Sequence, residues 1–145
     1  MPKLFIDAER LRDLNSGLGQ VCLHLGHELV RQCPPARDGG PRNGEPWQLT
    51  FLVPKGKSGI FGPSVSYVEA SWLRKLWILG RPGLGQYDVW HCLHQDSAYL
   101  PRQGQGKLIL TIYDLNFLER ADYSDTKKQR RIAQLQRKIN RASVL

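Results

Sequence analysis

Several polar side chains that can bind ligands or transfer protons follow short apolar runs in this sequence. They are Asp7, residues 94–97, and the pair Tyr113 and Asp114. If the apolar runs are parallel strands, these groups lie at one edge of a sheet, where ligands of such sheets bind. Carboxylates, a histidine, an amide and a phenol at one edge predict a polar ligand held by hydrogen bonds.

A glycine-containing segment, residues 16–20, is the second candidate for ligand binding. Gly17 and Gly19 let the backbone approach a ligand closely, and Ser16 and Gln20 flank them. A helix that begins here directs backbone N–H groups at an anion such as a phosphate. The third glycine of the dinucleotide fingerprint is missing, so a tight turn without a ligand explains the segment equally well.

Two histidine pairs and one cysteine raise the question of metal or covalent chemistry. His24 and His27 are three positions apart, as are His91 and His94, but neither pair has a third ligand nearby in the sequence, and we predict no metal site. We expect His91 to be a hydrogen-bonded core histidine. Cys92 lies in an apolar run, where cysteine is usually inert, and the sequence has no G-x-S-x-G motif, so we predict neither thiol nor hydrolase chemistry.

Strands and helices that alternate along the chain are predicted to position these residues. Predicted strands cover residues 3–7, 48–53, 65–69, 88–92 and 107–112, and residues 143–145 open another. Predicted helices cover residues 18–32, 72–79 and 124–141, and glycine-rich loops cover residues 34–46 and 55–64. The strands are apolar on both faces, which is typical of a parallel sheet covered by helices. We therefore predict an α/β, Rossmann-like domain with helices on both faces of a parallel sheet.

Apolar residues at helical spacing define the faces by which the predicted helices pack. In the first helix they are Leu18, Val21, Cys22, Leu25 and Leu29, and in the last they are Ile132, Leu135, Ile139 and Ala142. In the middle helix, we expect at least one of Trp72 and Trp77 to lie in the core.

The 145-residue chain has a net charge of +8, most of which lies in the last predicted helix. Residues 124–141 include seven lysines and arginines but a single acidic residue, Asp125. Such a surface suits phosphorylated ligands, an anionic membrane or nucleic acid. We favour a solvated helix face, or one packed on an acidic partner domain. Nucleic acid is the least favoured partner, because the loops lack the alternating aromatic and basic residues of a single-strand binder.

Cysteine usage and the N-terminal sequence indicate the compartment. The three cysteines include no CxxC pair, which favours a reducing cytosol over a disulfide scaffold. The apolar run before Asp7 is too short for a signal peptide, and no run is long enough to span a bilayer. We expect a cytoplasmic protein, with peripheral binding to the inner face of a membrane as a further expectation.

Four motifs follow one another in an order that points to a family. They are residues 5–7 with 15–20, residues 87–91 with Leu100 and Pro101, residues 110–115, and residues 136–142. The chain thereby resembles the large retaining glycosyltransferase family four, which has the GT-B fold. The second motif is similar to that family's "D-V-x-H … L-P" stretch and the third to its "T-I-H-D-L" stretch. The resemblance covers nearly the whole chain.

The resemblance implies the N-terminal, acceptor-side half of an enzyme that transfers a sugar from a nucleotide-sugar donor to a glycan or lipid-linked acceptor. Transfer in this family retains the anomeric configuration and needs no metal ion or other cofactor. A C-terminal domain, or a partner subunit, would hold the nucleotide sugar. By resemblance, the residues that approach the phosphates or sugar of the donor are Ser16, Gly17, Gly19 and Gln20. Those that line the acceptor side are His94, Gln95, Tyr113 and Asp114. The catalytic residues stay unassigned.

Two departures from the family pattern leave other functions open. Tyr113 stands where the family has histidine, and a tyrosine is a poor base near neutral pH because its reference pKa is about 10. The paired-glutamate domain that completes the donor site lies outside residues 1–145, so we expect a truncated single domain that is inactive alone. The alternatives are a non-catalytic module that binds a glycan, a nucleotide or a partner and, less favoured, a basic nucleic-acid-binding protein.

Overall fold

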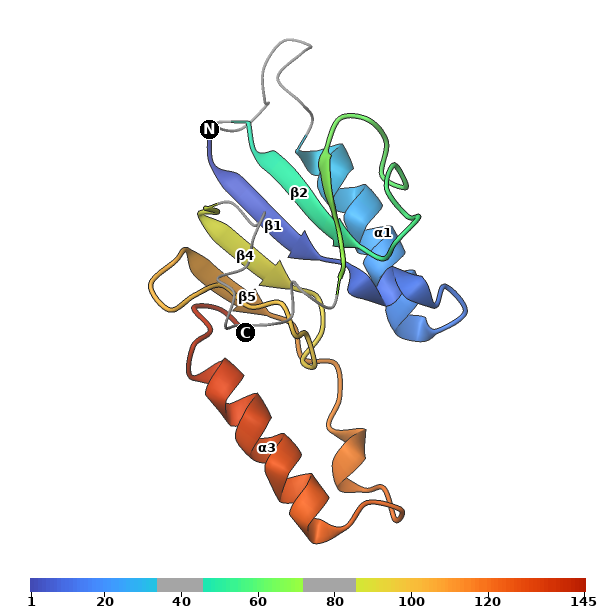
Figure 1. Cartoon of the computed structure of the whole chain (residues 1–145), viewed down its shortest axis with the longest axis vertical. Coiled ribbons are helices and arrows are strands. Elements are labelled where there is room, and N and C mark those ends of the chain that lie inside the picture. The colour runs from blue at the N-terminus through green and yellow to red at the C-terminus, as the bar shows by residue number, and fades with distance from the viewer. Residues whose placement is uncertain (34–45, 72–85) are drawn as a thin grey trace.

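The computed structural model describes residues 1–33, 46–71 and 86–145 (Figure 1). The described strands are β1 (Lys3–Asp7), β2 (Gln48–Val53), β3 (Ser66–Glu69), β4 (Val89–Cys92) and β5 (Lys107–Leu110). The described helices are α1 (Gly17–Gln32) and α3 (Asp125–Ile139), with short 3-10 helices η1 (Glu9–Arg12) and η3 (Asn116–Leu118). The helix predicted over residues 72–79, with Trp72 and Trp77, lies outside the described residues, as does nearly all of the loop predicted over residues 34–46.

The described strands form one parallel sheet in the order β3-β2-β1-β4-β5. In its register, Ile6 of β1 lies between Phe51 of β2 and His91 of β4. The chain runs outward from β1 to β2 and β3, and then returns to the other side of β1 to form β4 and β5. This confirms the predicted α/β class, and it makes β1 and β4 the two strands between which the strand order reverses.

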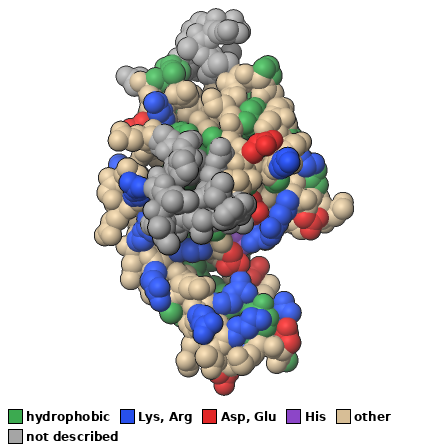
Figure 2. Space-filling model, viewed as in Figure 1, with side chains coloured by type: hydrophobic (Ala, Val, Ile, Leu, Met, Phe, Trp, Pro, Cys, Tyr) green, Lys and Arg blue, Asp and Glu red, His purple; other side chains and the backbone are tan. Residues whose placement is uncertain are grey.

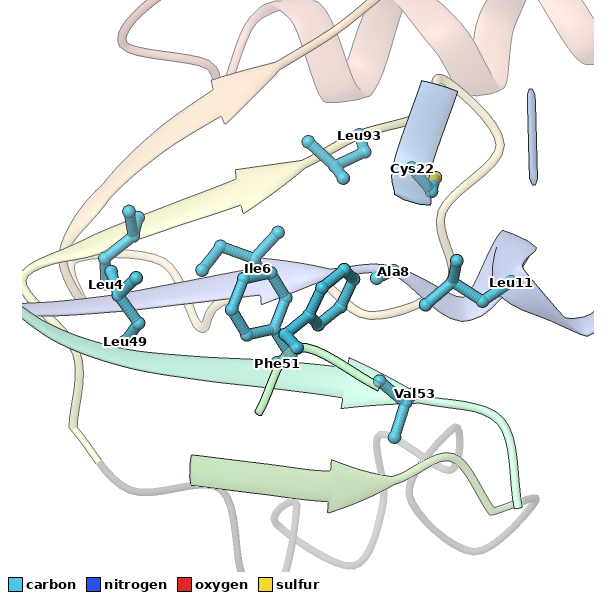
Figure 3. Close-up of a cluster of buried hydrophobic side chains, with 10 residues drawn as sticks. Leu4, Ile6, Ala8, Leu11, Cys22, Leu49, Phe51, Val53 and Leu93 are labelled. Atoms are coloured by element: carbon cyan, nitrogen blue, oxygen red, sulfur yellow. The ribbon is translucent and has the colours of Figure 1, made fainter. Parts of the chain in front are cut away.

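Two hydrophobic clusters form the core, one on each face of the sheet. On one face, side chains of β1 and β2 such as Ile6 and Phe51 pack with Cys22 of α1 (Figure 3). Neighbouring residues of a strand point to opposite faces. Phe5 therefore belongs to the second cluster, against which Leu135 and Ile139 of α3 pack. Helices thus cover both faces of the sheet, as predicted.

Serine caps set the starts of both long helices. The Ser16 hydroxyl accepts a hydrogen bond from the Gly19 N–H (3.1 Å), and the Ser124 hydroxyl accepts one from the Lys127 N–H (3.3 Å). A serine at this position satisfies a backbone donor that has no partner within its own helix. The predicted helix boundaries are therefore confirmed to within one residue at these ends.

The predicted packing faces of the helices are wrong at Val21 and Ile132. Val21 is exposed, because α1 turns Cys22 and Gly26 toward the core, where a side chain at Gly26 would lie 2.3 Å from the Phe61 ring. Ile132 is 45% exposed, because only the C-terminal part of α3 packs on the sheet while the rest of the helix extends away from it (Figure 1).

The end of β5 also differs from the prediction. The strand ends at Leu110, two residues before the expected boundary, and the Tyr113 N–H bonds to the Gln95 side chain instead of to a neighbouring strand. Beside β5, Val144 forms a parallel bridge with Ile109, in agreement with the strand expected at residues 143–145. None of the described helices combines the length and apolar character needed to cross a membrane.

Candidate functional site

A small polar pocket lies beyond the carboxyl ends of β1 and β4, where the strand order reverses. Ligands of open parallel sheets bind at this position, since the chains leaving the two strands diverge and leave a crevice. The pocket has a volume of about 140 Å³. It is lined by Asp7, Glu9, Arg10, Arg12, His94, Asp96, Ser97, Ala98 and Tyr99. We call it the switch-point pocket.

Asp7 and Ser97 form a buried pair at the base of this pocket. The Ser97 hydroxyl donates a hydrogen bond to one carboxylate oxygen of Asp7, and the Glu9 N–H donates to the other (3.0 Å). The Asp7 side chain is only 6% exposed, and burial raises its pKa to about 6 although the Ser97 hydrogen bond opposes that rise. Asp7 is therefore roughly nine-tenths ionised at pH 7 and is a stronger base than an ordinary aspartate.

Arg10 and His94 form a second polar contact in the switch-point pocket. Nη2 of Arg10 lies 3.3 Å from Nδ1 of His94, and the Asp96 N–H donates to the same nitrogen at 2.9 Å. Burial, and then the charge of Arg10, lower the pKa of His94 to about 4. The imidazole is thus neutral at pH 7, with Nδ1 as an acceptor, which assigns the ring hydrogen to Nε2. His94 is a hydrogen-bond donor at Nε2, not a base.

Gln95 braces the loop that follows β5. Its side-chain oxygen accepts the Tyr113 N–H (3.2 Å), and its amide nitrogen donates to the Asp114 carbonyl oxygen (2.8 Å). Gln95 is buried, and its side chain provides the hydrogen-bond partners that water would otherwise provide to these two backbone groups. The structure thus brings Gln95, Tyr113 and Asp114 together as predicted, but the Gln95 amide holds the backbone and does not line the switch-point pocket.

Tyr113 and Asp114 lie on the exposed side of this loop. Tyr113 is 37% exposed, and burial of the rest of its ring raises the pKa of the phenol. The Asp114 carboxylate accepts the Asn116 N–H at 3.1 Å, in the turn that leads into η3. Neither side chain lines the switch-point pocket, and their predicted contact with an acceptor stays a prediction.

The two predicted loop glycines have different surroundings. A side chain at Gly19 would lie 2.0 Å from the Asp13 carbonyl oxygen, so Gly19 allows the loop before α1 to pack onto the helix. Gly17 has open space around it, and the described chain offers no acceptor to the N–H groups of Gly17 and Leu18. The Gln20 amide donates to the Leu14 carbonyl oxygen (2.5 Å). Ser16 and Gln20 thus serve the local structure, and Gly17 is the position open to a ligand.

Basic residues of α3 hold the loop that carries the site. The Lys138 ammonium donates to the carbonyl oxygens of Gln95 (2.7 Å) and Ser97 (3.0 Å), and Arg131 forms an ion pair with Asp96 (2.8 Å). The predicted solvated face of α3 is therefore only partly right, because part of its charge points inward. The sequence alone could not predict these contacts, because more than thirty positions separate the partners.

Arg10 is one of the pocket residues that the sequence did not predict, as are Glu9, Arg12 and Tyr99. It lies three positions after β1, and therefore close to the carboxyl edge at which ligands were expected. Its place beside His94 depends on the pairing of β1 with β4, which the sequence pattern does not specify. Asp7 and Ser97 were expected at this edge but were not assigned a ligand.

His91 and Cys92, the remaining candidates for metal or covalent chemistry, make hydrogen bonds and contacts within the fold. Within the described residues, no group of three His, Cys, Asp or Glu side chains is arranged to hold a metal ion. His91 has the predicted hydrogen bond, as its Nε2 lies 3.0 Å from the Thr111 hydroxyl, but its side chain is half-buried and not in the core. Cys92 is fully buried, and its thiol contacts the Tyr99 carbonyl oxygen at 3.4 Å.

Comparison with known proteins assigns no family to this chain. No protein-family model matches it, and no curated protein or solved structure matches it significantly. The geometry of the site and the sequence motifs thus carry the functional inference.

Proposed function

We propose that this chain is the acceptor-side domain of a nucleotide-sugar-dependent glycosyltransferase and that the switch-point pocket holds the acceptor. The observation that carries the proposal is the Arg10–His94 contact of 3.3 Å, opposite the buried Asp7–Ser97 pair, where the strand order reverses. The resemblance of the sequence motifs to retaining glycosyltransferases supports the same assignment and adds metal-independent transfer with retention of configuration.

The mixture of donors and acceptors in the pocket suits a sugar ring. A sugar hydroxyl both donates and accepts hydrogen bonds, and the pocket offers donors on Arg10 and His94 beside an acceptor on Asp7. Drug-sized ligands occupy sites of roughly 300–1,000 Å³. A pocket of about 140 Å³ is smaller, and it suits one sugar ring better than a whole nucleotide sugar.

Asp7 is the group in this pocket best suited to orient the reacting hydroxyl. Its carboxylate is largely ionised at pH 7 but more basic than usual, because burial raises its pKa to about 6. A carboxylate of this kind accepts a strong hydrogen bond from an acceptor hydroxyl and so raises the nucleophilicity of the oxygen. His94, held neutral, fixes a second hydroxyl by donating from Nε2.

The nucleotide sugar belongs to a second Rossmann-like domain in this proposal. Gly17 and the start of α1 face that domain, and the unpartnered N–H groups of Gly17 and Leu18 stabilise charge on the departing diphosphate. Tyr113 in place of the family histidine contributes a hydrogen bond and not a base.

Binding of the chain to an array of neutral mono- and oligosaccharides tests the proposal. We expect wild-type protein to bind at least one sugar, and Arg10→Gln to weaken that binding about tenfold, as expected for loss of a charged hydrogen bond. Arg31→Gln is the matched control, since Arg31 lies on α1, outside the switch-point pocket, and pairs with Glu28. UDP-glucose and GDP-mannose are expected to bind weakly to this domain alone.

Other outcomes of the same experiment favour the other functions. Sugar binding that Arg10→Gln leaves unchanged, or no sugar binding at all, overturns the acceptor site. Tight UDP or GDP binding favours a nucleotide-binding module. Binding of a single-stranded oligonucleotide with a steep salt dependence favours a nucleic-acid-binding protein.

A further inference from the structure

A second, larger pocket lies between α3 and the loop that follows β4. Its volume is about 360 Å³. One wall is formed by Gln134, Arg137 and Lys138 of α3 and by Arg141 just beyond its end, and the opposite wall by residues 96–98 with Leu100. We call it the basic pocket. Figure 2 shows lysine and arginine side chains gathered over the part of the molecule where Figure 1 places α3.

Arg137 and Lys138 of the basic pocket form no ion pair with a carboxylate of the described residues. The one acid in the wall, Asp96, is already paired with Arg131 at 2.8 Å. Arg141 donates to the Pro101 carbonyl oxygen, and Lys138 donates to two backbone carbonyl oxygens. The charges of Arg137 and Lys138 can therefore attract an anion.

Partial burial strengthens the interaction of Lys138 with an anion. Lys138 is partly buried, and desolvation lowers the pKa of its ammonium. The charge of the nearby Asp96 opposes this shift only in part, and a bound anion would favour the charged ammonium further. An anion in the basic pocket thus gains more from Lys138 than it would from a fully solvated lysine.

The arrangement of the cations favours a phosphate group. Arg137 and Lys138 of α3 line the basic pocket together with Arg141, which lies just beyond the end of the helix, four and three positions after them. An arginine guanidinium bonds two phosphate oxygens at once, and a lysine ammonium adds a point charge. Three such groups around one pocket match the three free oxygens of a phosphate monoester.

The basic pocket adjoins the switch-point pocket. Both are lined by Asp96, Ser97 and Ala98, so this short segment separates them. A phosphate in the basic pocket therefore lies beside a sugar ring in the switch-point pocket. We propose that the basic pocket binds a phosphate group and that this phosphate belongs to the acceptor, an assignment that rests on the proposed function. The phosphate site itself does not depend on it.

Titration of the full chain with inorganic phosphate, glucose 6-phosphate and glucose tests this proposal, with binding followed by calorimetry or NMR. We expect Arg137→Gln to weaken the binding of both phosphates about tenfold, because it removes a charged hydrogen-bond donor. Arg130→Gln is the matched control, since it removes the same charge from an exposed position of α3 outside the pocket. It is expected to change affinity less than about threefold. Equal weakening by the two variants, or no phosphate binding, overturns the site.

Vesicles distinguish a lipid-linked phosphate from a soluble one. Binding to phosphatidylglycerol but not phosphatidylcholine vesicles, lost in Arg137→Gln and kept in Arg130→Gln, supports a lipid-linked phosphate in this pocket. Glucose 6-phosphate binding with the same dependence, and no vesicle binding, supports a soluble sugar phosphate. Vesicle binding that both variants weaken equally reports only the charge of α3 and counts against the site.

The two proposals fail in different ways. Phosphate binding that depends on Arg137 without any sugar binding that depends on Arg10 leaves the phosphate site standing and removes the acceptor assignment. Binding of neutral sugars that depends on Arg10, without phosphate binding, leaves the proposed function standing and overturns the phosphate site.

Discussion

The Lys138 ammonium lies 2.7 Å from the Gln95 carbonyl oxygen and thereby joins α3 to the loop that carries His94. The same ammonium donates to the Ser97 carbonyl oxygen at 3.0 Å. No residue of α3 is fully buried, so the helix depends on such polar contacts as well as on Leu135 and Ile139 for its position. The loop after β4 is therefore held from both sides, by Asp7 of β1 and by α3.

Replacing Lys138 with methionine tests this contact. Lys138→Met keeps the length of the side chain but leaves two carbonyl oxygens without their charged donor, and we predict a loss of about 1.5–3 kcal/mol of unfolding free energy. The corresponding fall in Tm, measured by calorimetry, is roughly 3–10 °C. Arg130→Met, at an exposed position of the same helix, is expected to change stability by less than about 0.5 kcal/mol. Equal stability of the two variants contradicts the structural role of Lys138.

The two glycines of the loop before α1 are expected to respond oppositely to alanine. A Cβ at Gly19 would lie 2.0 Å from the Asp13 carbonyl oxygen, which is part of the backbone and cannot move aside alone. We predict that Gly19→Ala costs about 1–3 kcal/mol of unfolding free energy in urea denaturation. Gly17→Ala meets open space and gains helix propensity, so it should be neutral or slightly stabilising. A tolerated alanine at position 19 contradicts the close packing.

Local sequence features predict most of the sheet and the helix starts. Residues 3–7 and 48–53 are short apolar runs bounded by polar residues, and β1 and β2 have these bounds. Ser16 and Ser124 precede helical patterns, and both are caps. Such signals lie within a few residues of the element that they predict, and no distant part of the chain alters them.

The site is less predictable because its contacts join distant parts of the chain. Arg10 and His94 are 84 positions apart, and they meet only because β1 and β4 are neighbours in the sheet. Gly19 shows a second reason why the site is hard to predict from the sequence. A glycine that approaches a ligand and one that approaches its own backbone have the same sequence pattern, and only the position of the Asp13 carbonyl oxygen distinguishes them.

Asp7 and His94 have pKa values that burial shifts in opposite directions. The pKa of Asp7 rises from 3.8 to about 6, and that of His94 falls from 6.5 to about 4. Between pH 4 and pH 6 the folded state therefore binds more protons than the unfolded state at Asp7 and fewer at His94. Rising pH lowers the unfolding free energy through Asp7 and raises it through His94, so the two contributions oppose one another in the wild type.

Replacing either residue is predicted to reveal the contribution of the other. Relative to the wild type, the unfolding free energy of Asp7→Asn should rise by about 1–3 kcal/mol from pH 4 to pH 6, and that of His94→Gln should fall by a similar amount. Urea denaturation at pH 4, 5 and 6 measures both slopes. The double variant, Asp7→Asn with His94→Gln, is the control and should follow the wild-type slope. Slopes of the same sign in the two single variants contradict the opposed shifts.

The Gln95 side chain is predicted to hold the Tyr113–Asp114 loop in place. Gln95→Ala removes the acceptor of the Tyr113 N–H and the donor to the Asp114 carbonyl oxygen, two part-buried hydrogen bonds that contribute about 0.5–1.5 kcal/mol each. Because the loop can open to water, we expect this loss to appear as faster amide hydrogen exchange at Tyr113, by about tenfold or more, with little change at Ile6 of β1. Gln95→Glu keeps the acceptor and loses the donor, so exchange at Tyr113 should be slower in it than in Gln95→Ala. If exchange at Tyr113 is equally fast in both variants, the acceptor oxygen of Gln95 is not what protects the loop.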